Sequence, residues 1–125
     1  MFQTFKMPKK DNRLIIYEKI NNLIFYSKNL LQKFPKSERF DLCTDIKNEL
    51  YNILRKVIWA WKEADIERKV RYLNEIDIEL YVIKTMVRLS YEYKYITNKN
   101  YMNWNAQIEE IGKMVGGWIK SCQRG

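Results

Sequence analysis

Four segments of the chain repeat apolar residues at alternating spacings of three and four, and this repeat limits the possible folds more than any other feature. The second segment is unbroken and runs through Cys43, Ile46, Leu50, Ile53, Val57, Ala60 and Ala64. Such spacing follows the 3.6-residue period of an α-helix and not the two-residue period of a strand. Further apolar residues beside each repeat widen the stripe to the breadth that a bundle core needs.

The turns between these segments are expected to be short. Pro35 should end the first helix, because the residue before a proline avoids the α region, and Ser37 should cap the second helix. The apolar repeat loses its phase near Asp65, which we expect to be the N-cap of the third helix. Thr97 or Asn98 should cap the fourth.

The pattern therefore predicts helices over residues 12–34, 38–64, 67–96 and 99–122. Long helices joined by short turns must fold back on one another. We expect an all-α fold, an up-down-up-down antiparallel four-helix bundle about 38 Å long at 1.5 Å per residue. No internal repeat or composition change marks a boundary, so residues 1–125 should form a single domain.

The charge is high and uneven. The chain carries 23 Lys and Arg against 15 Asp and Glu, a net charge of +8. Residues 1–62 hold 13 basic and 6 acidic residues, whereas residues 63–125 hold 10 basic and 9 acidic residues. A basic half favours a polyanionic partner, nucleic acid ahead of an anionic membrane surface. A basic surface with no partner is the alternative.

The residues argue against catalysis. The chain has no histidine, so the commonest general base and the commonest metal ligand are both missing. Glu75, Asp77 and Glu79 flank core positions and are expected on a solvated face. Cys43 and Cys122 fall at core positions and should be inert buried thiols, not a disulfide. We expect no catalytic site, no metal and no cofactor.

The longest apolar run has five residues, residues 57–61, so no segment is expected to span a membrane. Residues 1–13 lack the apolar region of a signal peptide. We therefore expect a cytoplasmic protein with no membrane partner.

A second stripe runs beside the core stripe of the third helix. It consists of Tyr81, Lys84, Arg88, Tyr91 and Tyr95. Aromatic residues between cations can stack on bases and neutralise phosphates, or they can form a subunit interface. The third alternative is that the tyrosines border the core while the cations extend into solvent.

Three stretches together resemble a known family. They are "IEEIGKMVGGWIKS" (108–121), "FPKSERFDL" (34–42) and "VIKTMVRLSYE" (82–92). With them, residues from about 11 to 122 resemble the accessory variability determinant (Avd) proteins of diversity-generating retroelements. These belong to a four-helix-bundle superfamily that also contains proteins encoded in 23S rRNA intervening sequences. The "GKMVGGWIKS" match is the more specific, whereas "PKSERF" is shared with the wider superfamily.

The resemblance implies a noncatalytic, basic homopentamer that acts in retrohoming. Such a protein binds a reverse transcriptase and structured template RNA, with cDNA as a further ligand, and supports mutagenic cDNA synthesis. The alternative is a structural interaction module of the rRNA-intervening-sequence type without a reverse transcriptase partner.

The matching motifs are mostly structural, so the candidate binding residues come from their position in the sequence. The first group lies in or beside the third-helix motif: Lys84, Arg88 and Tyr91. The second is the basic set of the N-terminal half: Lys9, Lys10, Arg13, Lys36, Arg39, Arg55 and Lys56.

Three of the four glycines lie inside the fourth predicted helix, where each costs about 1 kcal/mol relative to alanine. The apolar period continues past them, so the helix should not end there. Gly112 and Gly116 share one face, where a missing Cβ would let another backbone come close. With Gly117 and Trp118 they are expected to form a close helix contact, either inside the bundle or with a second subunit.

Overall fold

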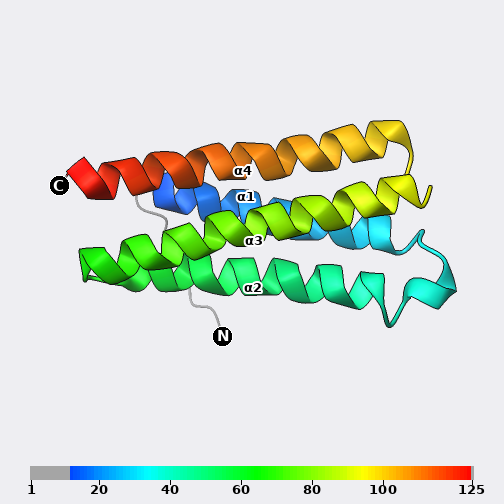
Figure 1. Ribbon diagram of the computed structural model, residues 1–125, viewed down its shortest axis with the longest axis horizontal. Coiled ribbons are helices and arrows are strands. Elements are labelled where there is room, and N and C mark those ends of the chain that lie inside the picture. Colours follow the sequence, from blue (N-terminus) through cyan, green and yellow to red (C-terminus); the bar gives the residue numbers. More distant parts are fainter. Residues whose placement is uncertain (1–11, 125) are drawn as a thin grey trace.

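The computed structural model describes the backbone of residues 12–124 and the side chains of residues 15–124. The elements are, in chain order, α1 (Asn12–Leu31), the short 3-10 helix η1 (Lys36–Glu38), α2 (Leu42–Lys62), α3 (Ile66–Glu92) and α4 (Asn98–Arg124). Each α-helix runs antiparallel to the next (Figure 1).

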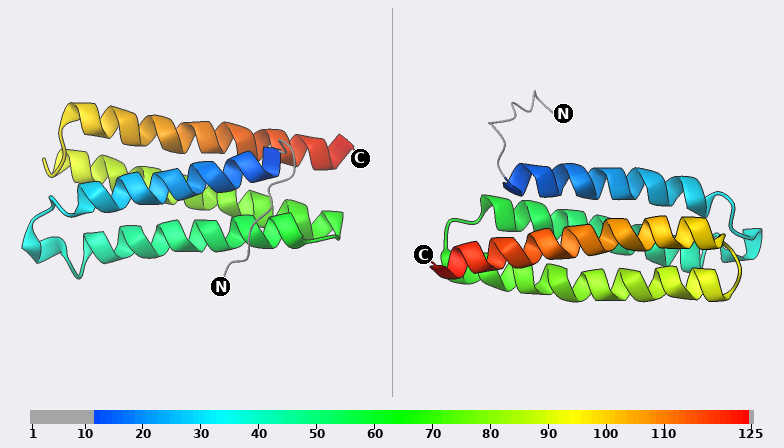
Figure 2. Two further views of the ribbon diagram at one scale, coloured as in Figure 1. Left: turned by 180° about the vertical axis from the view of Figure 1, so that it is seen from behind. Right: turned by 90° about the horizontal axis from the view of Figure 1, so that it is seen from above.

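The four helices form a ring of neighbours. α2 and α4 each pack against both α1 and α3, so α1 and α3 lie diagonally across the bundle (Figure 2). This arrangement confirms the predicted all-α, up-down-up-down four-helix bundle. One end of the bundle holds η1 and the α3–α4 turn, and we call it the η1 end. The opposite end holds the α2–α3 turn and the end of α4 (Figure 1).

The core follows the predicted stripes. The second stripe is buried from Cys43 to Ala60, the third from Leu73 to Val87, and the fourth from Trp104 to Trp118. Each fully buried Leu, Ile or Val side chain contributes about 1.5–3 kcal/mol relative to exposure. The helices are therefore held mainly by this shared apolar seam.

Ser27 is the polar member of the first stripe, and it is fully buried. Its hydroxyl donates to the Leu23 carbonyl of the same helix at 2.6 Å. It also accepts a hydrogen bond from Trp104 Nε1 of α4 at 2.8 Å. The serine thus satisfies the polar atom of the largest fully buried side chain.

The end of α1 differs from the prediction. The helix ends at Leu31 and not at Phe34. The amides of Lys33 and Phe34 donate to carbonyls three residues earlier, those of Leu30 and Leu31, which closes the chain into a tight turn before Pro35. The predicted range 12–34 was therefore three residues too long.

The start of α2 also differs. A helix was predicted from residue 38 with Ser37 as its cap, but Ser37 lies inside η1 and α2 begins at Leu42. Asp41 precedes α2 without a side-chain capping bond. The Glu38 carboxylate accepts a hydrogen bond from the Leu42 amide at 3.3 Å instead, so an acidic side chain one turn earlier serves this helix end.

The turn between α2 and α3 lies near Asp65, as predicted. The Asp65 carboxylate accepts a hydrogen bond from the Arg68 amide at 3.0 Å and caps α3. Ala64, which was predicted in the core, is exposed. α2 ends at Lys62, because Glu63 already has an extended backbone.

The α3–α4 turn begins earlier than predicted. α3 ends at Glu92 and not at residue 96, and the backbone of Lys94 is left-handed with φ 65°. The amide of Tyr95 donates to the carbonyl of Ser90, and that of Lys94 to Tyr91, which is the Schellman pattern of helix ends. Thr97 then caps α4 by accepting from the Asn100 amide at 3.1 Å.

α4 runs without a break to Arg124, two residues past the predicted limit of 122. Gly112, Gly116 and Gly117 lie within it. The prediction that these glycines do not end the helix is confirmed.

Candidate nucleic-acid interface

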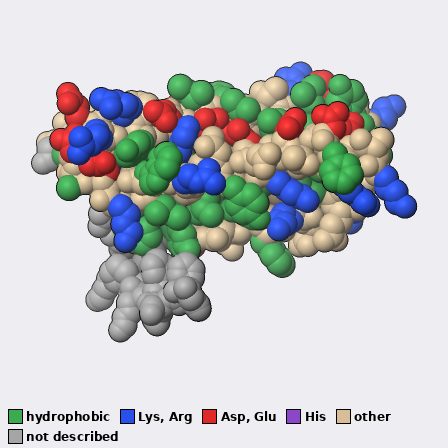
Figure 3. All heavy atoms as spheres, turned by 90° about the horizontal axis from the view of Figure 1, so that it is seen from below, with side chains coloured by type: hydrophobic (Ala, Val, Ile, Leu, Met, Phe, Trp, Pro, Cys, Tyr) green, Lys and Arg blue, Asp and Glu red, His purple; other side chains and the backbone are tan. Residues whose placement is uncertain are grey.

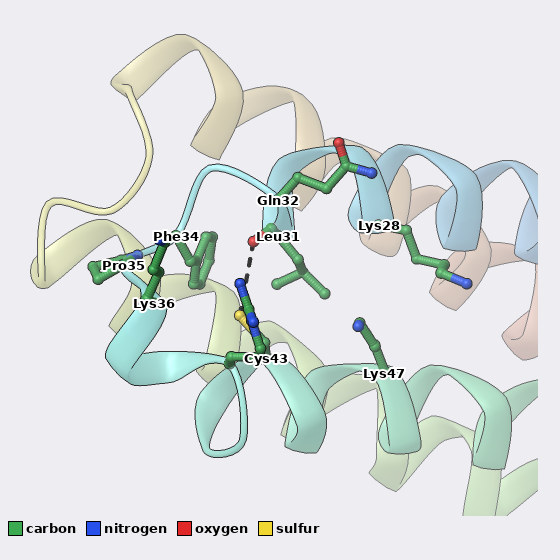
Figure 4. Close-up of a pocket in the computed structure, with 9 residues that line it drawn as sticks. Lys28, Leu31, Gln32, Phe34, Pro35, Lys36, Cys43 and Lys47 are labelled. Carbon is green, nitrogen blue, oxygen red and sulfur yellow. Dashed lines mark hydrogen bonds between the residues drawn. The ribbon is translucent and has the colours of Figure 1, made fainter.

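A cationic cleft lies at the η1 end of the bundle, where the chain passes from α1 to α2. The cavity is about 450 Å³ in volume. We call it the η1 cleft, and its walls are Lys28, Leu31, Gln32, Phe34, Pro35, Lys36, Arg39, Cys43 and Lys47. Figure 4 shows the side chains of Lys28 and Lys47 extending into the space between α1 and α2.

The charged and apolar walls of the η1 cleft occupy different depths. Leu31, Phe34 and Cys43 are buried and form the floor. Lys36 and Arg39 are exposed at the rim, with Lys47 half-buried below them. The cleft therefore combines positive charge at its mouth with a small apolar surface inside.

No carboxylate lines the η1 cleft, and none of its four cations forms an ion pair with another described residue. Lys28 has only a neutral partner, the Tyr51 hydroxyl at 3.3 Å. The Glu38 carboxylate, whose charge also acts on Cys43, accepts a hydrogen bond from the Tyr95 hydroxyl at 2.6 Å and forms no ion pair with a cation of the cleft. The four cations of the cleft therefore have no direct ion-pair partner among the described residues.

Cys43 lies at the floor of the η1 cleft. Its thiol faces the Leu31 carbonyl, with Sγ 3.8 Å from the oxygen (Figure 4). Burial raises the pKa of the Cys43 thiol, and the nearby charges of Lys47 and Arg39 only partly oppose this. Cys43 and Cys122 are both free cysteines, and Cys122 is half-buried. The raised pKa agrees with the predicted inert thiol at position 43.

The predicted basic set is divided by the structure. Lys36 and Arg39 lie together in the η1 cleft. Arg55 is exposed on α2, away from the residues that line this cleft. Lys9 and Lys10 lie outside the described residues. The backbone of Arg13 belongs to α1, but its side chain is not among those that the structure describes.

Lys56 is engaged inside the protein. Its ammonium group pairs with Glu79 at 2.9 Å and with Glu75 at 3.2 Å, and its side chain is 14% exposed. Lys56 therefore ties α2 to α3, and its assignment to a nucleic-acid surface does not fit this geometry. Of the three carboxylates expected on a solvated face, Asp77 is exposed and the Glu75 side chain is 44% exposed, whereas Glu79 is 21% exposed and lies in the contact between two helices.

Glu49 of α2 lies beside this ion-pair group. Its Oε2 atom is buried and has no hydrogen-bond partner among residues 15–124. Burial, and then a hydrogen bond with Glu79, raise the pKa of Glu49 to about 8. The hydrogen bond from Glu49, and then the one from Lys56, lower the pKa of Glu79. The two carboxyl groups thus hold one proton between them at neutral pH.

The two cations of the predicted α3 stripe each have an acidic partner. Lys84 pairs with Glu109 of α4 at 3.0 Å, and Arg88 pairs with Glu92 of its own helix at 3.0 Å. The Arg88 side chain is 69% exposed, so this pair is solvated and weak. A binding role for Lys84 and Arg88 stays a prediction.

The tyrosines of that stripe separate. Tyr91 stacks on Tyr101 of α4, with ring centroids 4.5 Å apart and planes 11° apart. Tyr95 lies beyond the end of α3 and donates to Glu38. The hydrogen bond to Glu38, and then burial, raise the pKa of Tyr95 to about 12. Tyr95 therefore fastens the α3–α4 turn to η1 and is not part of a helical ridge.

The predicted close approach at the glycines does not occur within this bundle. A Cβ at Gly112 would lie 4.0 Å from Leu80 Cδ1, which is ordinary contact. A Cβ at Gly116 or Gly117 would meet no atom of the described chain within 4 Å. Trp118 is buried in the core of its own chain. The other alternative, a second subunit against this face, stays a prediction.

A second groove lies beside Gly112, between α3 and α4. This α3–α4 groove has a volume of about 400 Å³ and is lined by Asp77, Leu80, Tyr81, Lys84, Ile108, Glu109, Gly112 and Lys113. Unlike the η1 cleft it contains two acidic side chains, and one of its two lysines is already paired. The α3–α4 groove is therefore a weaker candidate for an anion-binding site than the η1 cleft.

The surface over α2 carries charges of both signs. Figure 3 shows Asp and Glu side chains in a band across its upper part, with Lys and Arg side chains among them at the left-hand end, whereas Lys and Arg predominate in the lower part and at the right-hand tip. The right-hand tip is the η1 end. Within the described residues, no group of three or more acidic or cysteine side chains is placed to hold a metal ion.

None of the described helices is both long and apolar enough to cross a membrane.

Sequence reasoning missed Lys28 and Lys47. Lys28 lies three residues before Leu31 on α1, and Lys47 lies four residues after Cys43 on α2, so each shares a helix face with another residue of the η1 cleft. The fold-back expected at Pro35 was only a partial signal, because Lys28 lies seven residues before this proline and Lys47 twelve residues after it, so the spacing alone did not show that the two face each other.

Comparison with known proteins gives one family. The family model described as bAvd-like matches residues 14–122 of this chain. Among solved structures, the chain is similar to a Bacteroides thetaiotaomicron protein of unknown function from the S23 ribosomal protein family. The TM-score is 0.80 at 19% identity, over 88% of this chain and 99% of that one, which is a likeness of fold. No curated protein matches.

Proposed function

The chain belongs to the bAvd-like family, and on that premise we propose that it is a noncatalytic accessory protein of a diversity-generating retroelement. It binds the template RNA and the reverse transcriptase of that element and supports mutagenic cDNA synthesis in the cytoplasm. The family match over residues 14–122 carries this proposal, because it spans all four helices.

The charge of the surface supports RNA as a partner. The net charge of +8 is concentrated in residues 1–62, which include both helices that border the η1 cleft. Phosphate contacts from Lys and Arg supply most of the affinity of proteins for nucleic acids without regard to sequence. The missing histidine agrees with a protein that binds and does not catalyse.

An exposed apolar stripe supports assembly of several subunits, five by resemblance to the Avd proteins. On α3, Ile78 is 63% exposed, Val82 37% and Leu89 38%. Their spacing of four and seven places them on one face of the helix. A stripe of this kind is unusual on the surface of a protein that stays monomeric.

The proposal is tested by co-purification. The chain should be expressed together with the reverse transcriptase encoded next to it in its genome, with a reverse transcriptase from an unrelated element as the matched control. We expect retention of the first enzyme and not of the control.

RNA binding forms the second arm of that test. Affinity for template RNA should fall by about a thousandfold between 50 and 200 mM salt if roughly six phosphates are contacted. An affinity that does not change with salt would contradict RNA binding through these cations. RNA binding without any reverse transcriptase partner would favour the alternative, an interaction module of the rRNA-intervening-sequence type.

A further inference from the structure

The cations of the η1 cleft form no ion pair with any residue that the structure describes. Four cations line one cavity of about 450 Å³, and no carboxylate lines it. Like charges that gather without neutralisation raise the local potential and favour a bound anion. Lys56 and Lys84, by contrast, each form an ion pair with a glutamate carboxylate.

The floor of the η1 cleft adds a second requirement for its ligand. Leu31, Phe34 and Cys43 offer apolar surface below the cations. Gln32 contributes an amide, which can both donate and accept hydrogen bonds. A ligand that suits this cleft therefore has an anionic part for the rim and a flat, largely apolar part with polar edges for the interior.

We infer that the η1 cleft binds an unpaired nucleotide of RNA, with its phosphate on the cations and its base above the apolar floor. This inference rests on the proposed function and names the surface that meets the RNA. An acidic protein segment would satisfy the cations, but a carboxylate only accepts hydrogen bonds and leaves the apolar floor and the Gln32 carbonyl acceptor unused.

The size of the cavity favours an unpaired nucleotide over a paired one. Sites for small organic ligands span about 300–1,000 Å³, and the η1 cleft lies within that range. A base that enters the cleft must leave its helix, and proteins read RNA mostly at such unstacked positions. A regular duplex would reach only the cations at the rim.

The test compares two double variants. Arg39→Ala/Lys47→Ala removes two cations of the η1 cleft. Lys62→Ala/Lys120→Ala removes two cations from the opposite end of the bundle, where both are exposed and unpaired among the described residues. Both variants lose the same net charge. Circular dichroism should confirm that both keep the helical fold.

Fluorescence anisotropy is measured with a labelled oligouridine, a fully paired RNA duplex of the same length and a poly-glutamate peptide of equal charge. For the oligouridine, the cleft variant should bind on the order of tenfold more weakly than the wild type. Its slope of log K against log salt should be shallower by about 1.4, because each lost phosphate contact on a single strand contributes about 0.7. The control variant should change little, and the cleft variant should weaken duplex binding much less than oligouridine binding, because the duplex loses only the rim cation Arg39.

Three results would overturn the inference while leaving RNA binding intact. Equal losses in the cleft and control variants would mean that overall charge holds the RNA. An equal loss for duplex and oligouridine would mean that no base enters the cleft. Tight binding of poly-glutamate that disappears in the cleft variant would assign the cleft to an acidic protein segment. A wild type that binds no RNA even at low salt would instead contradict the proposed function itself.

Discussion

At the scale of single residues, Ser27 joins α1 to α4 from inside the core. Its hydroxyl is the acceptor for Trp104 Nε1 at 2.8 Å, and both side chains are fully buried. Water cannot replace a lost partner at such a depth without opening the core. The position therefore requires a small residue with a hydrogen-bond acceptor, although its place in the repeat is an apolar one.

We expect Ser27→Ala to lower the free energy of unfolding by about 2 kcal/mol, because it leaves the Trp104 donor buried and unpaired. Ser90→Ala is the matched control. Ser90 is also fully buried and donates to the carbonyl four residues earlier, but among the described residues it accepts no hydrogen bond from another helix. Urea denaturation measures the free energy of unfolding of both variants. If Ser27→Ala and Ser90→Ala lose the same amount, the hydrogen bond between α1 and α4 adds nothing to stability.

The limits of sequence reasoning are clear at this scale. Ser27 occupies an apolar position of the α1 repeat, but its partner depends on how α1 and α4 are aligned along the bundle, which the period does not specify. The same holds for Lys56, which looks like any surface lysine until α2 and α3 are aligned and Glu75 and Glu79 come within reach.

At the scale of elements, the contact between α2 and α3 contains a group of charges that shares one proton. Glu49, Glu79 and Lys56 meet there, and the pKa of Glu49 is raised to about 8 by burial and then by Glu79. An unfolded chain releases the Glu49 proton near pH 4.5, whereas the folded chain keeps it until about pH 8. Glu49 therefore makes the protein less stable as pH rises through this window.

Glu49→Gln should remove that dependence, because an amide keeps a hydrogen-bond donor for Glu79 without titrating. We expect the variant to exceed the wild type in stability by about 1–2 kcal/mol at pH 8, after allowing for partial solvent exposure, and by much less at pH 5. Thermal denaturation across this range measures the effect, and Glu18→Gln, an exposed site on α1, is the control. A gain that is the same at both pH values would mean that Glu49 is already ionised in the folded state.

The elements themselves could be predicted, but the segments between them only in part. The apolar repeat extends over many residues in each segment, so it predicted the four helices and their buried faces even though single positions depart from it. Near Pro35 the local signal was misleading, because Ser37 suits a helix start but lies within η1, and α2 begins only at Leu42. The η1 cleft depends on that segment, and so its two missed lysines could not be placed.

At the scale of the whole molecule, the outer surface of α4 raises the question of assembly. Gly116 costs about 1 kcal/mol of helix stability relative to alanine, and nothing in its own chain explains it, since a Cβ there would meet no described atom within 4 Å. An approaching second subunit would explain it.

Gly116→Leu should therefore change the mass of the protein in solution while helix content is kept or increased. Light scattering together with circular dichroism measures both quantities. Gly117→Leu is the comparison, because that site lies about 100° round the helix, is exposed and is equally free of neighbours in its own chain. An unchanged mass for the Gly116 variant would show that no subunit approaches α4 at this position.

The thiol at the floor of the η1 cleft has a practical consequence. Cys43 is 5% exposed and can be reached only through the space that a ligand would fill, whereas Cys122 lies near the end of α4 at the opposite end of the bundle. A thiol reagent applied to the native protein would therefore carry two signals. The modification rate at Cys43 would report occupancy of the cleft, and the rate at Cys122 would calibrate the reagent within the same molecule.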